Sequence, residues 1–327
     1  MSNATEASTQ AIALRVLSLS MYSFAFVGNA VVLCAFLKYP SLRSKECLRL
    51  IAGLAVCDMN AGFFSMMWIS LVIAEQLGLT AHYSKLECLA VNTPQHCALL
   101  AGQLMTLQIA RDRFDLFRDS TNYHFKDHAS FAFRSFLVSQ IVGHLFMVIA
   151  YIGLDYHTML PFCNVGFCYT EFFFLCLTFY ILGVGCAVLV LYVGAILLMR
   201  QATKRYKASK EKDAALERQI KVTKTINVVM FCYCMFWLAP LSLFLGSVFA
   251  GVSGPIMQII EPIADVAAAI NGSINTVIYA AKHDEIRAHL AALLRCKAPN
   301  QVQPALQASL SAKRTSQRNR NVREAEV

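Results

Sequence analysis

Charged residues are scarce in this 327-residue chain: they make up 15% of it, while hydrophobic residues make up 57%. Soluble domains carry about 25% charged residues on average, so the composition excludes an ordinary soluble protein. An apolar segment of about 20 residues is long enough to cross a membrane as a helix. Seven such segments use nearly the whole chain: 12–37, 48–74, 88–117, 131–154, 170–199, 222–250 and 256–281. The sequence therefore predicts an all-α membrane protein, a seven-transmembrane helix bundle.

The chain also lacks the residue pairs that chemistry inside a membrane requires. The apolar segments hold no paired nucleophile and base, and no two histidines stand at metal-binding spacing, since His82, His96, His144 and His157 are scattered. We therefore expect neither an enzyme nor a metal site. No internal repeat is visible, and repeats are typical of transporters.

Basic residues lie almost entirely on one side of the predicted bundle. Of the 29 Lys and Arg residues, all but Arg15 and Lys85 fall in or beside the loops 38–47, 118–130 and 200–221 or in the C-terminal tail. Cytoplasmic loops carry the excess of Lys and Arg, so we expect an extracellular N-terminus and a plasma-membrane protein. The net charge of +9 reflects this distribution, and no nucleic-acid partner is expected.

Four regions are expected along the chain. They are an extracellular N-terminal tail (1–11), the seven-helix domain (12–281), an amphipathic cytoplasmic helix (282–296) and a disordered cytoplasmic tail (297–327). The short eighth helix is predicted because Ile286, Leu290, Leu293 and Leu294 form one apolar stripe at helical spacing. The first apolar segment has no basic leader and is expected to remain as a helix.

Four modifications are expected outside the membrane spans. Asn3 begins an N-glycosylation sequon, and Cys296 follows the amphipathic stripe as a palmitoylation candidate. On the outer side, Cys88 can form a disulfide with Cys163 or else with Cys168. Hydroxyl residues of the tail could accept phosphate and recruit an arrestin: Ser309, Ser311, Thr315 and Ser316.

Two groups of polar residues lie inside the apolar segments, where an ionisable side chain costs about 2.5 kcal/mol or more. Asp58 is the most costly, and Asn29, Asn271 and Asn275 lie at similar depth in their own segments. They form either a hydrogen-bond network that joins helices or a cation or proton site around Asp58. The second group is in 105–117, MTLQIARDRFDLF, where the charges form either a solvated helix end or an ion pair that a change of packing releases.

The order of these motifs resembles rhodopsin-like G-protein-coupled receptors over about residues 12–296, and in general appearance nematode-type serpentine chemoreceptors. The residues that carry the resemblance follow the chain: Gly28-Asn29, Leu54 with Asp58, Cys88, Asp112-Arg113-Phe114, Pro240 and Asn275-Thr276-Val277-Ile278-Tyr279. The chain departs from the family where Thr276 replaces a proline, and where Gly102 replaces a serine beside the sodium site.

The resemblance implies a role for each matching residue. Arg113 would pair with Asp112 at rest and, after the sixth helix moves, reach toward Tyr192, Tyr279 and the C-terminus of a G-protein α subunit. Asn275 would belong both to this switch and to a water network with Asp58, Asn29 and Asn271, where a sodium ion is the one cofactor considered. Pro240 would kink the sixth helix.

The outer half of the bundle is expected to bind the ligand. Amine receptors of the family carry an acidic residue where Gln95 stands, so a standard biogenic amine is disfavoured, and Ala269 replaces the lysine that retinal requires. Glu261 and Asp265 share one helix face, so cationic or peptide ligands are candidates. The expected pocket residues are Gln95, His96, Trp68, Trp237, Ser242, Asp265 and Glu261.

The sequence thus predicts a G-protein-coupled receptor of chemosensory or neuropeptide type, with an extracellular ligand, a heterotrimeric G protein, an arrestin and membrane lipid as partners. The alternative is a ligand-gated channel or transporter of the plasma membrane. A seven-helix odorant-gated channel would place the N-terminus inside the cell, against the distribution of Lys and Arg.

Overall fold

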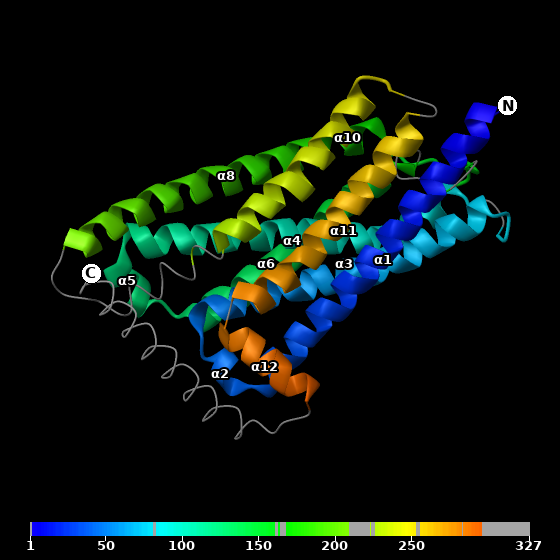
Figure 1. The fold of residues 1–327 in the computed structure, drawn as a ribbon. Coiled ribbons are helices and arrows are strands. Elements are labelled where there is room, and N and C mark those ends of the chain that lie inside the picture. The colour runs from blue at the N-terminus through cyan, green and yellow to red at the C-terminus, as the bar shows by residue number, and fades with distance from the viewer. Residues whose placement is uncertain are drawn as a thin grey trace, which may run out of the picture.

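The computed structural model shows a bundle of long helices (Figure 1). It describes residues 2–80, 83–160, 163, 168–208, 223, 226–252, 256–282 and 284–295. Within these residues there is no β-strand, and the one isolated bridge joins Ser84 to Met159. The predicted all-α fold is confirmed.

Six of the described helical segments are long and apolar enough to cross a membrane: Gln10–Lys38, Leu48–Gln76, His128–Tyr151, Glu171–Lys204, Ile226–Phe249 and Ile259–Ala281. They belong to α1 (Ser2–Lys38), α3 (Glu46–Gln76), α6 (His128–Val148) with η1 (Ile149–Tyr151), α8 (Glu171–Ala208), the sixth span, and α11 (Met257–Lys282). The sixth span consists of helical residues 226–233, the π-helical turn η2 (Cys234–Leu238) and α10 (Ala239–Phe249). Each predicted apolar segment other than 88–117 corresponds to one of these six.

The seventh predicted segment, 88–117, lies within α4 (Lys85–Arg118), which is as long as the others but more polar. Asn92, Gln95, Gln103 and Thr106 are buried along it. This composition fits the place of α4 in the bundle, where it packs against α3, α6 and α8. A helix covered by other helices needs less lipid-compatible surface, because neighbouring helices can satisfy its polar side chains.

Short helices gather at the end of the bundle opposite the N-terminus (Figure 1). They are α2 (Pro40–Arg43), α5 (Ser120–Phe125) and α12 (Asp284–Leu294). α12 is the predicted amphipathic eighth helix: Ile286 and Ala292 are buried in a cluster that includes Tyr39 and Leu42. The His289 ring lies 3.0 Å from the Ser41 hydroxyl, which ties α12 to α2.

Some element boundaries differ from those expected. α1 begins at Ser2 and so runs through the segment 1–11 that we expected as a tail. No Gly or Pro occurs before Gly28 in α1, so the sequence carries no strong signal to stop the helix there. The short helices α2 and α5 were not expected, and neither was the π-helical turn. That turn ends two residues before Pro240, which lacks the N–H that a regular helix would use at this point.

The outer loop between α6 and α8 is fastened to the bundle at several points. The structure joins Cys88 of α4 to Cys163, the first of the two predicted pairings. The Cys163 amide also donates to a carboxylate oxygen of Glu75 at 2.7 Å. The Leu160 amide donates to the Tyr83 carbonyl at 2.9 Å. The loop therefore lies across the outer ends of α3 and α4.

Candidate functional site

Capping interactions fix the chain where α4 ends, at the end of the bundle that the sequence predicts to be cytoplasmic and that we call the inner end. Asp119 ends α4 and caps α5, because its carboxylate accepts a hydrogen bond from the Asn122 amide at 3.1 Å. Asp127 caps α6 in the same way through the amides of Ala129 and Ser130. The hydrogen bonds from the Ser130 hydroxyl and amide hold the pKa of Asp127 below its ordinary value. α5 is thereby held beside the last turns of α4.

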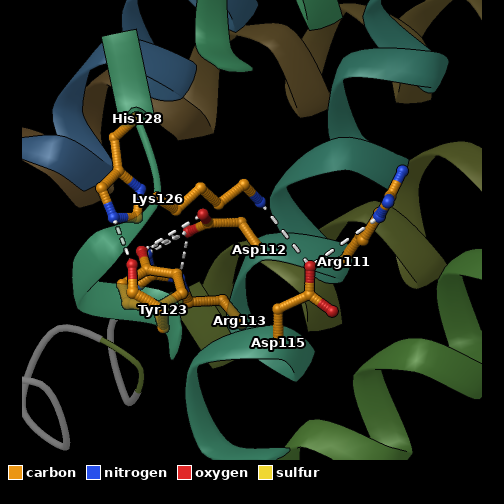
Figure 2. A network of polar contacts seen from close by, with 7 residues as sticks. All are labelled: Arg111, Asp112, Arg113, Asp115, Tyr123, Lys126 and His128. Carbon is orange, nitrogen blue, oxygen red and sulfur yellow. Dashed lines mark hydrogen bonds and ion pairs between the residues drawn. The ribbon is translucent and has the colours of Figure 1, made fainter. Parts of the chain in front are cut away.

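Four residues from α4, α5 and α6 meet there in what we call the inner network: Asp112, Arg113, Tyr123 and His128 (Figure 2). The guanidinium of Arg113 donates to the Asp112 carboxylate through both Nε, at 3.1 Å, and Nη2. Tyr123 lies against both charges: its hydroxyl is 3.2 Å from each Asp112 oxygen and accepts from Arg113 Nη2 at 3.1 Å. Asp112 and Arg113 are each 2% exposed.

His128 supports the network from α6. Its Nε2 lies 2.9 Å from the Tyr123 carbonyl, and the two rings are 4.4 Å apart between centroids. The ion pair is thus enclosed by side chains from three helices, where a charge without a partner would be costly.

The neighbouring charges form a separate pair of contacts that is partly exposed to solvent (Figure 2). Asp115 lies 3.8 Å from Arg111 and 3.7 Å from Lys126, and the Lys126 ammonium lies 3.4 Å from the centre of the Phe131 ring. Exposed ion pairs contribute about 0–1 kcal/mol. The reading of a solvated helix end therefore fits Arg111 and Asp115, whereas the reading of an enclosed ion pair fits Asp112 and Arg113.

The structure places the other expected switch residues on other helices. The Tyr192 hydroxyl on α8 donates to the Asn227 carbonyl of the sixth span at 2.9 Å. Tyr279 on α11 is 1% exposed and belongs to the cluster that includes Tyr39 and Ile286. Asn275 lies deeper in the bundle, where its side-chain amide donates to Asp58 at 2.9 Å.

Tyr123 and His128 were missed by the sequence reasoning. They lie in a polar segment between two predicted spans. Apolar residues do not recur there at helical spacing, so the sequence gives no sign that this segment contacts Asp112. One signal was present: Asp119, three residues before Asn122, is a typical helix N-cap. It predicts a short helix but not the contact that the helix makes.

Near the middle of the bundle, Asp58 and the three asparagines expected around it come close together. Asp58 and Asn271 line one cavity, which also borders Gly102 and Trp237. Asn29 donates to the Gly272 carbonyl at 3.2 Å and to the Ala25 carbonyl at 2.9 Å. The group therefore joins α1, α3 and α11, in keeping with the hydrogen-bond reading.

The residues at this cavity include side-chain oxygens that could hold the sodium ion considered in the sequence analysis. Asp58 supplies a carboxylate, and the side-chain oxygens of Asn271 and Asn275 have no hydrogen-bond partner among the described residues. Oxygen ligands of this kind suit a hard cation. Gly102 adds no side-chain oxygen, so main-chain groups or water would complete the coordination.

A second cavity lies nearer the end of the bundle that the sequence predicts to be extracellular, and we call it the outer cavity. Five of the seven expected pocket residues line it: Gln95, His96, Trp237, Glu261 and Asp265. Trp237 borders both cavities. Trp68 and Ser242 are not among the lining residues. Trp68 is buried beside Arg15, and the Ser242 hydroxyl donates to the Leu238 carbonyl of its own helix.

Arg15 is the residue of this region that the sequence reasoning did not assign. It is 2% exposed, and its guanidinium lies 3.9 Å from the Glu261 carboxylate and 5.6 Å from the centre of the Trp68 ring. The contact with Glu261 could not be predicted from the sequence, because the two residues lie at opposite ends of it.

Other expected sites stay untested. The Asn3 side chain, Cys296 and the tail hydroxyl residues (Ser309, Ser311, Thr315 and Ser316) lie outside what the structure describes. In the described part of the chain, no group of three His, Cys, Asp or Glu residues is placed to hold a metal ion.

Comparison with known proteins matches most of the chain to one family. A family model described as serpentine type 7TM GPCR chemoreceptor Srsx matches residues 22–294, from α1 to the end of α12. Curated proteins give no match to the chain. The matched segment contains the inner network, both cavities and the Cys88–Cys163 disulfide.

Proposed function

Because the chain belongs to the Srsx family of serpentine-type seven-transmembrane G-protein-coupled chemoreceptors, we propose that it is a plasma-membrane receptor that binds an extracellular chemosensory ligand and activates a heterotrimeric G protein. The observation that carries this proposal is the inner network. It encloses Arg113 at the cytoplasmic end of the bundle, where a G protein would bind, and gives it partners that a change in packing can remove.

The network suits a switch because the free energy of burying its two charges depends on whether both are paired. Removing one member of a buried ion pair costs about 3–5 kcal/mol, because the other charge is left uncompensated. Arg113 therefore leaves Asp112 and Tyr123 only where another acceptor or water is available. The open cytoplasmic face of an active receptor, with the C-terminus of a G-protein α subunit, would supply such acceptors.

The two cavities support a route from ligand to switch. Trp237 lies in the π-helical turn of the sixth span and borders both the outer cavity and the cavity at Asp58. A ligand in the outer cavity that prefers one position of this turn would favour one packing of the sixth span. A ligand shifts such an equilibrium only by its difference in affinity for the two states, and moving it from mostly inactive to mostly active takes about 5.5 kcal/mol.

The proposed receptor also has an orientation in the membrane and partners other than the G protein. The one-sided Lys and Arg residues support an extracellular N-terminus, and the basic stretch 200–224 would attract anionic lipid. An arrestin would bind the phosphorylated tail. A sodium ion at Asp58, held with Asn271, would supply a positive charge that favours the resting packing.

Guanine-nucleotide exchange on a reconstituted G protein, measured without ligand, tests the proposal. Asp112→Asn removes the charge that pairs with Arg113, and we expect it to raise basal exchange more than about tenfold. Arg113→Ala removes the side chain proposed to engage the G protein, and we expect it to abolish exchange. Arg111→Ala serves as the control, because Arg111 is exposed and outside the inner network. Exchange that stays at the wild-type rate in both network variants, with equal receptor at the cell surface, would contradict the proposal.

A further inference from the structure

The outer cavity is mostly apolar. Its walls include Leu99, Leu177, Ile181, Leu241 and Phe244, contributed by α4, α8 and α10. The walls therefore suit a small molecule with an apolar body.

The charged side chains that line the cavity are both acidic. Glu261 and Asp265 stand four residues apart and so share one face of α11, and the described lining contains no Lys or Arg. Arg15 approaches from α1 and lies 3.9 Å from Glu261, with both side chains almost fully buried. One arginine thus faces two carboxylates, and the cavity keeps one negative charge in excess when both acids are ionised.

The lining atoms without a hydrogen-bond partner in the described structure include two side-chain oxygens that accept but do not donate. They are Oδ2 of Asp265 and Oε1 of Gln95. Gln95 is only 2% exposed, so bulk water has little access to its side chain. Buried acceptors without a partner are costly, and a ligand that brings donors would remove that cost. A protonated amine brings up to three donors and a positive charge.

We propose that the outer cavity binds a small apolar ligand with one positive charge, and that Asp265 is the counter-ion for it. This proposal names the ligand class of the receptor function proposed above and rests on it. The acidic residue lies on α11, whereas the α4 residues that line the cavity include Gln95 and His96 but no Asp or Glu. An anionic ligand would be repelled by the excess charge, and a neutral ligand would leave Asp265 without compensation.

Three probes of the same shape separate charge from apolar contact: 4-phenylbutylamine, 4-phenylbutanol and 4-phenylbutanoate. The readout is the thermal unfolding midpoint of the purified full-length receptor in detergent, titrated with each probe. We expect the amine to raise the midpoint most, the alcohol less and the carboxylate least. This comparison needs no variant, and equal shifts for the three probes, or no shift with any of them, would overturn the proposal.

Asp265→Asn tests the counter-ion with little change in shape. Loss of a charge-assisted hydrogen bond weakens binding by roughly tenfold or more, so we expect the amine to lose its advantage over the alcohol. Asp155→Asn is the matched control, because it removes an exposed carboxylate of the outer loop. An amine preference that persists unchanged in Asp265→Asn would assign the cation to another group.

The midpoint assay contains no G protein, so its outcome is independent of the exchange assay. If the amine binds through Asp265 while Arg113→Ala leaves exchange unchanged, the ligand class stands and the proposed coupling fails. If exchange depends on Arg113 while the three probes do not differ, the receptor function stands and the ligand class fails.

Discussion

At the residue scale, the phenol of Tyr123 contacts both charges of the inner network. Its hydroxyl lies within 3.2 Å of the two Asp112 oxygens and of Arg113 Nη2. Tyr123→Phe keeps the ring and its contact with His128 but removes these hydrogen bonds. One hydrogen bond contributes about 0.5–1.5 kcal/mol, so we expect basal nucleotide exchange to rise up to about tenfold. The effect should be smaller than that of Asp112→Asn.

Tyr156→Phe provides the control for this substitution. Tyr156 is an exposed tyrosine of the outer loop, and its hydroxyl donates to the Tyr151 carbonyl at 3.0 Å. Tyr156→Phe also removes a phenolic oxygen, but at the opposite end of the bundle, so basal exchange should not change. Equal exchange in Tyr123→Phe and the wild type would show that the hydroxyl does not hold the resting packing.

Single residues also show how far the site could be predicted. Asp112, Arg113 and Asp58 stand out in the sequence because charges are rare in apolar segments. Their partners do not stand out: Tyr123 lies in a polar connection, and Arg15 meets Glu261 across most of the chain length. Such contacts depend on how helices are arranged around one another, which the apolar period of one segment does not specify.

At the element scale, the close approach of α4 and α6 depends on Gly143. A Cβ atom there would lie 2.9 Å from the Cys97 carbonyl oxygen and 3.2 Å from the Ala101 amide nitrogen, both main-chain atoms of α4. Gly143→Ala must therefore push the two helices apart. Overpacking of this kind costs about 1–3 kcal/mol, and we expect a lower thermal unfolding midpoint for the purified receptor.

Gly183→Ala is the matched control on α8. A Cβ atom at Gly183 meets nothing within 4 Å, so this variant makes the same chemical change without the clash. We expect its midpoint to equal or exceed that of the wild type, because alanine favours a helix over glycine. If both variants melt at the same temperature, the α4–α6 contact does not limit stability.

The long elements were the easiest to predict, and α4 shows why. Its polar residues lower its hydropathy, yet the length of its apolar segment, 88–117, was enough to predict a span. The amphipathic stripe likewise predicted α12. The short helices α2 and α5 and the π-helical turn were not predicted, because each depends on local capping or on one proline rather than on a repeated pattern.

At the scale of the whole molecule, the one-sided basic residues set the expected orientation. An epitope at the N-terminus should be stained on unpermeabilised cells, and one at the C-terminus only after permeabilisation. The glycan expected at Asn3 should be removed by a glycosidase and be absent in Asn3→Gln. Staining of the C-terminal epitope on intact cells would reverse the orientation and place the inner network outside the cell.

The most direct measurement is a structure of the receptor bound to a nucleotide-free G protein. The proposed function requires that Arg113 leaves Asp112 and Tyr123 in that complex and contacts the C-terminus of the α subunit. A complex in which Arg113 keeps its present hydrogen bonds to both residues, with the G protein bound elsewhere, would contradict it.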